Sequence, residues 1–210
     1  MTEVDLPKAR SETADDPSPS AGPNAMSEFV PRLQDAVFSE HLVRGCTEDV
    51  LGNPSLQQDA EARLLVRQIH QRAEQHVSDV HTLLVQLGDQ PSAVSETLGA
   101  GLGRTLGWME RLPGRDLVEV IRDLYVALNY TAAGYHVVYA GACLLEQNAA
   151  ADLALRHLRD YTPAIRQLSR LLAWAAALEV PSQRWHGSGA MDEITATLFE
   201  SWSSEIPLDR

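Results

Sequence analysis

Cysteine is scarce in this sequence. Only Cys46 and Cys143 are present, and they form no Cys-x-x-Cys pair. A disulfide framework is therefore not expected, and a reducing cytoplasm is the default location. The N-terminus also lacks the basic residues and the following apolar stretch of a signal peptide, so secretion is not expected.

Common catalytic motifs are absent as well. No Ser/His/Asp signature or phosphate-binding loop occurs, and the glycine series at 99, 101 and 103 follows no expected strand. Positive charge is low, because 17 Lys and Arg face 29 Asp and Glu and give a net charge of −12. Such a surface repels phosphate backbones and anionic lipids, so neither nucleic acid nor a membrane is an expected partner.

Ionic side chains are missing from residues 124–145 altogether. A stretch of this length suffices to cross a bilayer, for which about 20 apolar residues are needed. However, Asn129, Thr131 and His136 lie across its middle, and its tyrosines do not gather at the ends as membrane aromatics do. The run therefore predicts a helix that other helices of a soluble bundle bury over most of its circumference.

Apolar residues at steps of three and four predict several helices. The strongest pattern starts after Asn53, a natural N-cap, with Pro54 in the first turn, and it ends at Gly88. No segment alternates with a period of two, so the sequence predicts an all-α protein. The apolar positions of the strongest pattern are Ala62, Val66, Ile69, Ala73, Val77, Val80, Leu84 and Leu87.

Weaker signals place the remaining elements of the chain. A disordered tail (residues 1–27), a helical bundle (28–180) and a C-terminal extension (181–210) are expected. The expected elements, in order, are a short amphipathic segment from Pro31 to Arg44 that Gly45 ends, a glycine-weakened helix over 92–109, the neutral helix capped by Asp116, a turn at Asn148, a helix from Asp152 to Leu178 kinked at Pro163, and an amphipathic piece from Met191 to Trp202.

Seven histidines raise the question of a metal site. His70, Glu74 and His81 point within about 40° of one another on the helix after Asn53, but they spread along about 16 Å, which is too far for one ion. His76 projects into the apolar stripe of the same helix, where a buried imidazole needs a partner. That partner is a metal, a tyrosine hydroxyl or a backbone carbonyl.

His157 and Asp160 stand three residues apart, which is the spacing but not the order of the Glu-x-x-His pairs of di-iron bundles. One hypothesis is therefore a His-rich site for iron, manganese or zinc. The alternative is that ordinary core hydrogen bonds satisfy these histidines. The candidate ligands are His70, His76, His81, His136 and His157, with Glu74.

The tyrosines of the neutral helix are candidates to line a pocket. Gly134 and Cys143 would leave room for a small apolar ligand beside Tyr135 and Tyr139, in the kind of space found between bundle helices. The alternative is that these aromatic side chains are ordinary core residues whose hydroxyls are hydrogen-bonded.

Residues 128–168 resemble the last helix pair of ferritin-like bundles, and they are most similar to the bacterial YciE/YciF-type stress bundles. The stretch from His70 to Gly88 resembles the second helix of that family, which also ends in Leu-Gly. The resemblance implies an up-and-down four-helix bundle. Where the family's third helix carries carboxylates upstream of Tyr135, this chain has Leu128 and Thr131, so no standard di-iron ligand set is carried over.

Together these observations predict a cytoplasmic, ferritin-like four-helix bundle that is stress-related or acts as a binding or scaffold protein, without enzymatic activity. A metal-binding or oxidoreductase bundle that uses the His-rich site is one alternative, and a binder of a small apolar ligand is another. Homo-oligomer formation and a protein partner docked through the C-terminal segment stay open.

Overall fold

The computed structural model describes residues 23–89 and 116–179, together with positions 193, 196, 197 and 200. These residues form helices and short turns, and no strand occurs among them, which confirms the all-α prediction. Residues 1–22 of the tail expected over 1–27, the helix expected over 92–109 and most of the piece from Met191 to Trp202 lie outside the described residues. Residues 23–27, the end of the expected tail, are helical. The elements are α1 (Pro23–Gly52), the 3-10 helix η1 (Pro54–Gln58), α2 (Ala60–Gln86), α4 (Leu117–Leu144) and α5 (Asn148–Glu179).

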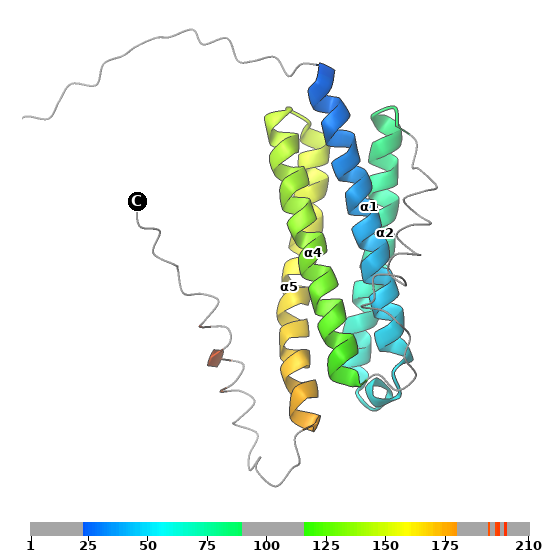
Figure 1. Cartoon of the computed structure of the whole chain (residues 1–210), viewed down its shortest axis with the longest axis vertical. Helices are drawn as coiled ribbons and strands as arrows, with labels where there is room; N and C mark the ends of the chain where they lie inside the picture. Colours follow the sequence, from blue (N-terminus) through cyan, green and yellow to red (C-terminus); the bar gives the residue numbers. More distant parts are fainter. Residues whose placement is uncertain (1–22, 90–115, 180–192, 194–195, 198–199, 201–210) are drawn as a thin grey trace, which may run out of the picture.

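The four long helices form a bundle in which α1 and α5 each pack against both α2 and α4 (Figure 1). Each of these neighbours runs antiparallel, so α2 and α4 lie on one diagonal of the bundle and point the same way. Gln86 and Leu117 therefore lie at opposite ends of the bundle. The four-helix bundle is confirmed. Direction alternates within each pair, α1 with α2 and α4 with α5, but α4 runs the same way as α2.

The start of α2 differs from the prediction. The side chain of Asn53 accepts a hydrogen bond from the Ser55 amide (2.9 Å), but it caps only η1. Asp59 caps the long helix by accepting from the Ala62 amide (2.9 Å). Apart from this later start the pattern is confirmed, since Ala62, Val66, Ile69, Ala73, Val80 and Leu84 are buried.

Helix α1 is longer than expected. The prediction that Gly45 ends a short segment is wrong, because one helix runs from Pro23 to Gly52 and includes Gly45 and Pro31. Apolar side chains keep the helical period on both sides of the glycine, with Leu33, Val37 and Val50 fully buried. Packing against α2 and α4 outweighs the cost of about 1 kcal/mol for a glycine inside a helix.

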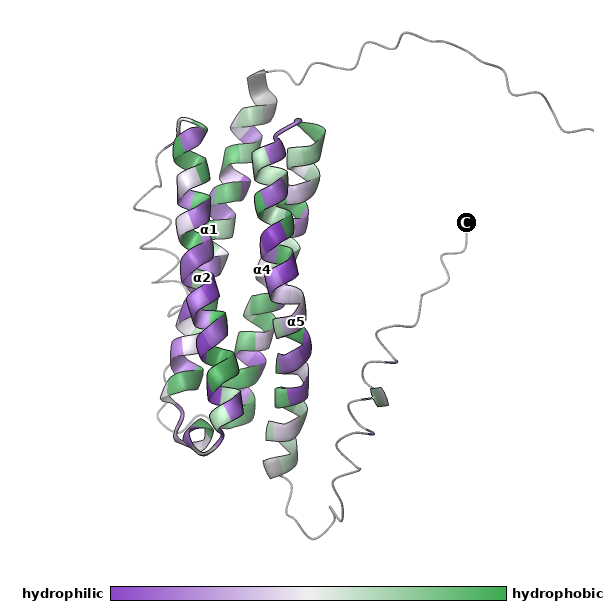
Figure 2. Ribbon diagram, turned by 180° about the vertical axis from the view of Figure 1, so that it is seen from behind, coloured by the Kyte–Doolittle hydropathy of each residue, from purple (hydrophilic) through white to green (hydrophobic). Residues whose placement is uncertain are grey.

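The second helix pair starts and turns close to the expected places. Asp116 caps α4 by accepting from the Glu119 amide (2.7 Å), as predicted. Helix α5 begins at Asn148, and it continues unbroken through Pro163. Figure 2 shows hydrophilic and hydrophobic residues alternating along α2 and α5, as expected of helices that bury one side.

Helix α4 buries only one side of its neutral run within the described part of the chain. Leu124, Leu128 and Tyr135 are fully buried, whereas Tyr130 is 57% and Val137 55% exposed. The neighbouring helices thus cover less of this helix than the sequence predicted. None of the helices in the described ranges has the length and hydropathy of a membrane span.

Two glycines of α4 offer a test of this packing. A methyl group at Gly134 would meet no atom within 4 Å, whereas at Gly141 it would lie 3.3 Å from the buried Phe29 ring of α1. We expect Gly134→Ala to raise the free energy of unfolding by about 0.5–1 kcal/mol, because alanine restricts the unfolded chain. Gly141→Ala should gain less, since Phe29 must shift. Urea denaturation of both variants measures the difference, and equal gains would contradict the close approach of α1 and α4.

Candidate metal centre

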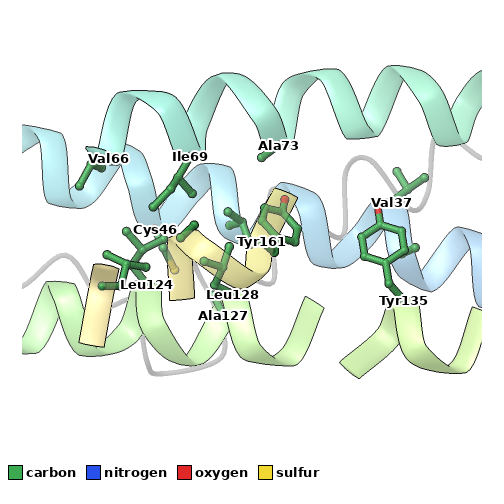
Figure 3. Close-up of a cluster of buried hydrophobic side chains, with 14 of the residues drawn as sticks. Val37, Cys46, Val66, Ile69, Ala73, Leu124, Ala127, Leu128, Tyr135 and Tyr161 are labelled. Atoms are coloured by element: carbon green, nitrogen blue, oxygen red, sulfur yellow. The ribbon is translucent and has the colours of Figure 1, made fainter. Parts of the chain in front are cut away.

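A polar cluster lies in the middle of the hydrophobic core. Its members are Glu40 from α1, His76 from α2, Tyr135 from α4, and His157 and Tyr161 from α5, and each is at most 2% exposed. Figure 3 shows the two tyrosine side chains among apolar core residues. Buried polar groups are nearly always hydrogen-bonded, so the partners of each atom decide what the cluster can do.

Helical periodicity places these polar residues inside. Glu40 follows Leu33 and Val37 by steps of four and three, and His76 stands between the buried Ala73 and Val80. Each therefore occupies a position where its helix would otherwise carry an apolar side chain. The fold aims these side chains at the bundle axis without any special backbone conformation.

The Glu40 carboxylate is the hub of the cluster. Its Oε1 accepts a hydrogen bond from the Tyr135 hydroxyl (2.7 Å) and lies 3.0 Å from Nδ1 of His76. Its Oε2 accepts a hydrogen bond from the Tyr161 hydroxyl. Burial, and then the charge of Glu40, hold the pKa values of both Tyr135 and Tyr161 well above the ordinary value. Both phenols therefore stay protonated and act as donors.

His76 lies between two carboxylates. Its Nδ1 faces Glu40, and its Nε2 lies 3.2 Å from Oδ2 of Asp160 on α5. Asp160 is 40% exposed and also pairs with Arg72 of α2 (3.5 Å). The Nδ1–H group can donate to Glu40, and a metal bound at Nδ1 would take the place of that proton while Nε2–H donates to Asp160.

His157 has one satisfied and one unsatisfied nitrogen. Its Nε2 lies 3.4 Å from Oδ2 of Asp79, whereas its buried Nδ1 has no hydrogen-bond partner among the described residues. Burial and the neighbouring His76 lower the pKa of His157 to about 3, so the ring is neutral near pH 7. A neutral ring that donates through Nε2 leaves a lone pair on Nδ1.

Asp79 is held ready to accept from His157. Partial burial alone would raise the pKa of Asp79, but hydrogen bonds from Gln75 and His157 and the charge of Arg156 outweigh it and lower the pKa. The ionised carboxylate accepts a hydrogen bond from the side-chain amide of Gln75 (2.8 Å), and it lies 3.4 Å from the guanidinium group of Arg156. These contacts fix the tautomer of His157 that leaves Nδ1 free of a proton.

Three side chains of the cluster have the chemistry of metal ligands. Glu40, His76 and His157 each offer one ligand atom, and these atoms lie within 4.8 Å of one another. Two imidazole nitrogens and one carboxylate oxygen suit iron, manganese or zinc. Each histidine also has a carboxylate at its other ring nitrogen, Asp160 for His76 and Asp79 for His157, as metal-bound histidines usually do. The unpartnered Nδ1 of His157 is what a metal would satisfy.

The structure brings together two of the six ligands predicted from the sequence, His76 and His157. His70 instead contacts the Thr47 hydroxyl (2.8 Å) and lies 3.7 Å from Glu74 at the edge of α2. His81 is half-buried further along α2, and His136 is exposed on α4 rather than in the core. These four candidates lie outside the cluster of Glu40, His76 and His157.

The residues proposed to line an apolar pocket do not converge on one enclosed space. Tyr135 is fully buried and bonded to Glu40, whereas Tyr139 is 37% exposed and Cys143 is exposed. Gly134 is half-buried on another side of α4. Of these four residues, the candidate metal centre includes only Tyr135, as a donor to its carboxylate.

Sequence reasoning missed Glu40, Asp79 and Tyr161. A signal for Glu40 existed, because it continues the apolar period of Leu33 and Val37. Asp160 was recognised as a neighbour of His157, but it faces His76 instead.

Comparison of the chain with protein-family models, curated proteins and solved structures finds no match. The fold and the cluster thus define the class by themselves, which is an all-α four-helix bundle with a buried carboxylate–histidine site.

Proposed function

We propose that this protein is a metal-binding helical bundle whose ion is held by Glu40, His76 and His157. The observation that carries the proposal is the buried Nδ1 of His157, which has no partner among the described residues. An unsatisfied buried nitrogen is costly unless something binds it. Glu40 and His76 offer the further ligand atoms within 4.8 Å.

The surroundings of these ligands support a divalent ion of the iron, manganese or zinc type. Asp79 and Asp160 would hold the rings of His157 and His76 in place through their outer nitrogens. Tyr135 and Tyr161 would keep the Glu40 carboxylate oriented. Bound to these two histidines and one carboxylate, such an ion would supply redox chemistry if it is iron or manganese and Lewis-acid chemistry if it is zinc.

The ferritin-like resemblance extends this proposal. One long connection between two antiparallel pairs is an arrangement found in ferritin-like folds. In the Glu-x-x-His motif of di-iron bundles the carboxylate stands three residues before the histidine, and here those positions before His76 and His157 hold the buried Ala73 and Ala154. We therefore propose a single-ion centre in a ferritin-like bundle. A stress-related role rests on the resemblance alone.

Metal content tests the proposal. Protein stripped with chelator and reloaded separately with Fe(II), Mn(II) or Zn(II) is expected to retain about one ion per chain for at least one of these metals. His157→Ala should lose stoichiometric binding, because it removes the unsatisfied nitrogen, and mass spectrometric metal analysis measures the loss. His136→Ala is the matched control, since this exposed histidine lies on α4 outside the cluster.

Equal metal content in His157→Ala and the wild-type protein would contradict the proposal. A second candidate function would then remain, a binding or scaffold bundle in which the cluster is a structural hydrogen-bond network. Its support is that Glu40 already faces three donors, from Tyr135, Tyr161 and His76.

A further inference from the structure

The outer side of α4 carries a stripe of exposed apolar residues. Its members follow one another at alternating steps of four and three, which is the seven-residue repeat of a seam between two helices. The exposed fractions reach 57% at Tyr130 and 84% at Leu144. We call this set the α4 stripe, and it consists of Val126, Tyr130, Ala133, Val137, Ala140 and Leu144.

The α4 stripe lies opposite the core. At about 100° per residue, its members point away from the buried Leu124 and Tyr135, and the packing of α1 and α5 leaves them exposed. An apolar surface that is regular over several turns of one helix is typical of an interaction site. In the ranges that the structure describes, no other element covers it.

Charge singles out this surface for contact between two copies of the chain. Each copy has a net charge of −12, so most pairs of faces would bring like charges together. Residues 124–145 have no ionic side chain, and the α4 stripe lies within them. Two copies can therefore meet here without burying a charge.

The side-chain sizes along the α4 stripe are self-complementary when the helix is reversed. Pairing about the midpoint of the stripe places Tyr130 opposite Ala140 of a second copy and Val137 opposite Ala133 of that copy. The same operation pairs Val126 with Leu144. In the two inner pairs a large residue thus meets a small one, as interdigitating helices require. A parallel arrangement would instead set Tyr130 against Tyr130 of the second copy, and each alanine against the same alanine of that copy.

We propose that two copies of this chain associate through the α4 stripe, with their α4 helices antiparallel about a twofold axis. A twofold contact uses the same patch on both subunits, which the reversal symmetry of the stripe provides. The stripe is about 27 Å long, and one pair of helices makes a small interface. The dimer should therefore be weak, with a dissociation constant on the order of micromolar.

Sedimentation velocity of the full chain over roughly 1 to 200 µM tests association, because the dimer population follows mass action. Val137→Glu should raise the dissociation constant about 100-fold or more, since it sets two carboxylates near the twofold axis. Val85→Glu is the matched control, because Val85 is 61% exposed but lies on α2. Its dissociation constant should equal that of the wild-type protein.

Disulfide trapping tests the direction of the helices. In a Cys143→Ser background, the double variant Val126→Cys, Leu144→Cys should form covalent dimers, whereas Val126→Cys alone should not. Trapping by Val126→Cys alone would overturn the antiparallel pairing.

A wild-type chain that is monomeric throughout, or equal weakening by Val137→Glu and Val85→Glu, would overturn the dimer. If a monomeric chain showed altered hydrogen exchange in residues 191–202 upon Val137→Glu, the C-terminal segment would be the occupant and the proposal would fail.

Discussion

Glu40→Ala is expected to lower the free energy of unfolding by about 4 kcal/mol, even in metal-free protein. The substitution leaves the Tyr135 and Tyr161 hydroxyls and Nδ1 of His76 without their common acceptor in the core. Each buried donor without an acceptor costs about 1–3 kcal/mol, and the lost side-chain volume adds a cavity. For a chain of this size the melting temperature should fall by roughly 10 °C.

Chemical denaturation in the presence of chelator measures this loss independently of any bound ion. Glu48→Ala is the control, because Glu48 is an exposed carboxylate on the same helix and should change stability by less than about 0.5 kcal/mol. Glu40→Gln should fall between the two, since the amide keeps one acceptor oxygen but turns an NH2 group toward a donor. A Glu40→Ala protein as stable as Glu48→Ala would show that the carboxylate is not the hub of the cluster.

The sequence predicted the helices where local and tertiary preferences agree. The apolar residues of α2 recur at steps of three and four without interruption, and the Asp116 cap marks the start of α4. Prediction failed at Gly45, where a local stop signal competes with a continuous buried face. Packing of α1 against two other helices decides that competition, and a sequence alone does not reveal which helices will be neighbours.

The candidate site could be predicted only in part for the same reason. Helical period was enough to place His76 in the core, and spacing drew attention to His157. Their partners depend on how the helices pair, because Glu40 is 36 residues from His76 and Asp160 is 84 residues from it. The spacing of His157 and Asp160 was therefore informative, although each of them serves a partner on α2.

The neutral run of α4 shows a related ambiguity. A stretch without charge predicts an environment that excludes charge, but it does not say which molecule provides that environment. One side of α4 meets the core of its own bundle, and the other side carries the exposed α4 stripe. If a second copy of the chain covers the α4 stripe, both sides of α4 lack charge for the same reason, which is that each side packs against protein.

Acidification is expected to destabilise the metal-free protein by about 3 kcal/mol between pH 6.5 and pH 4, through His157 alone. Burial lowers the pKa of His157 from 6.5 to about 3 in the folded chain. Between these values the unfolded chain binds a proton at this residue and the folded chain does not, so stability falls as the pH falls. The lowered pKa of Asp79 acts in a separate window below its ordinary value of 3.8.

Urea denaturation at several pH values, with chelator present, isolates this contribution when variants are compared. His157→Gln should lose about 1.4 kcal/mol per pH unit less than the wild-type protein across this window, because glutamine does not titrate. His136→Gln should keep the wild-type slope, since His136 is exposed on α4. If His157→Gln and His136→Gln showed the same slope, His157 would not be a neutral buried imidazole. Its Nδ1 would then carry a proton and could not offer a lone pair to a metal.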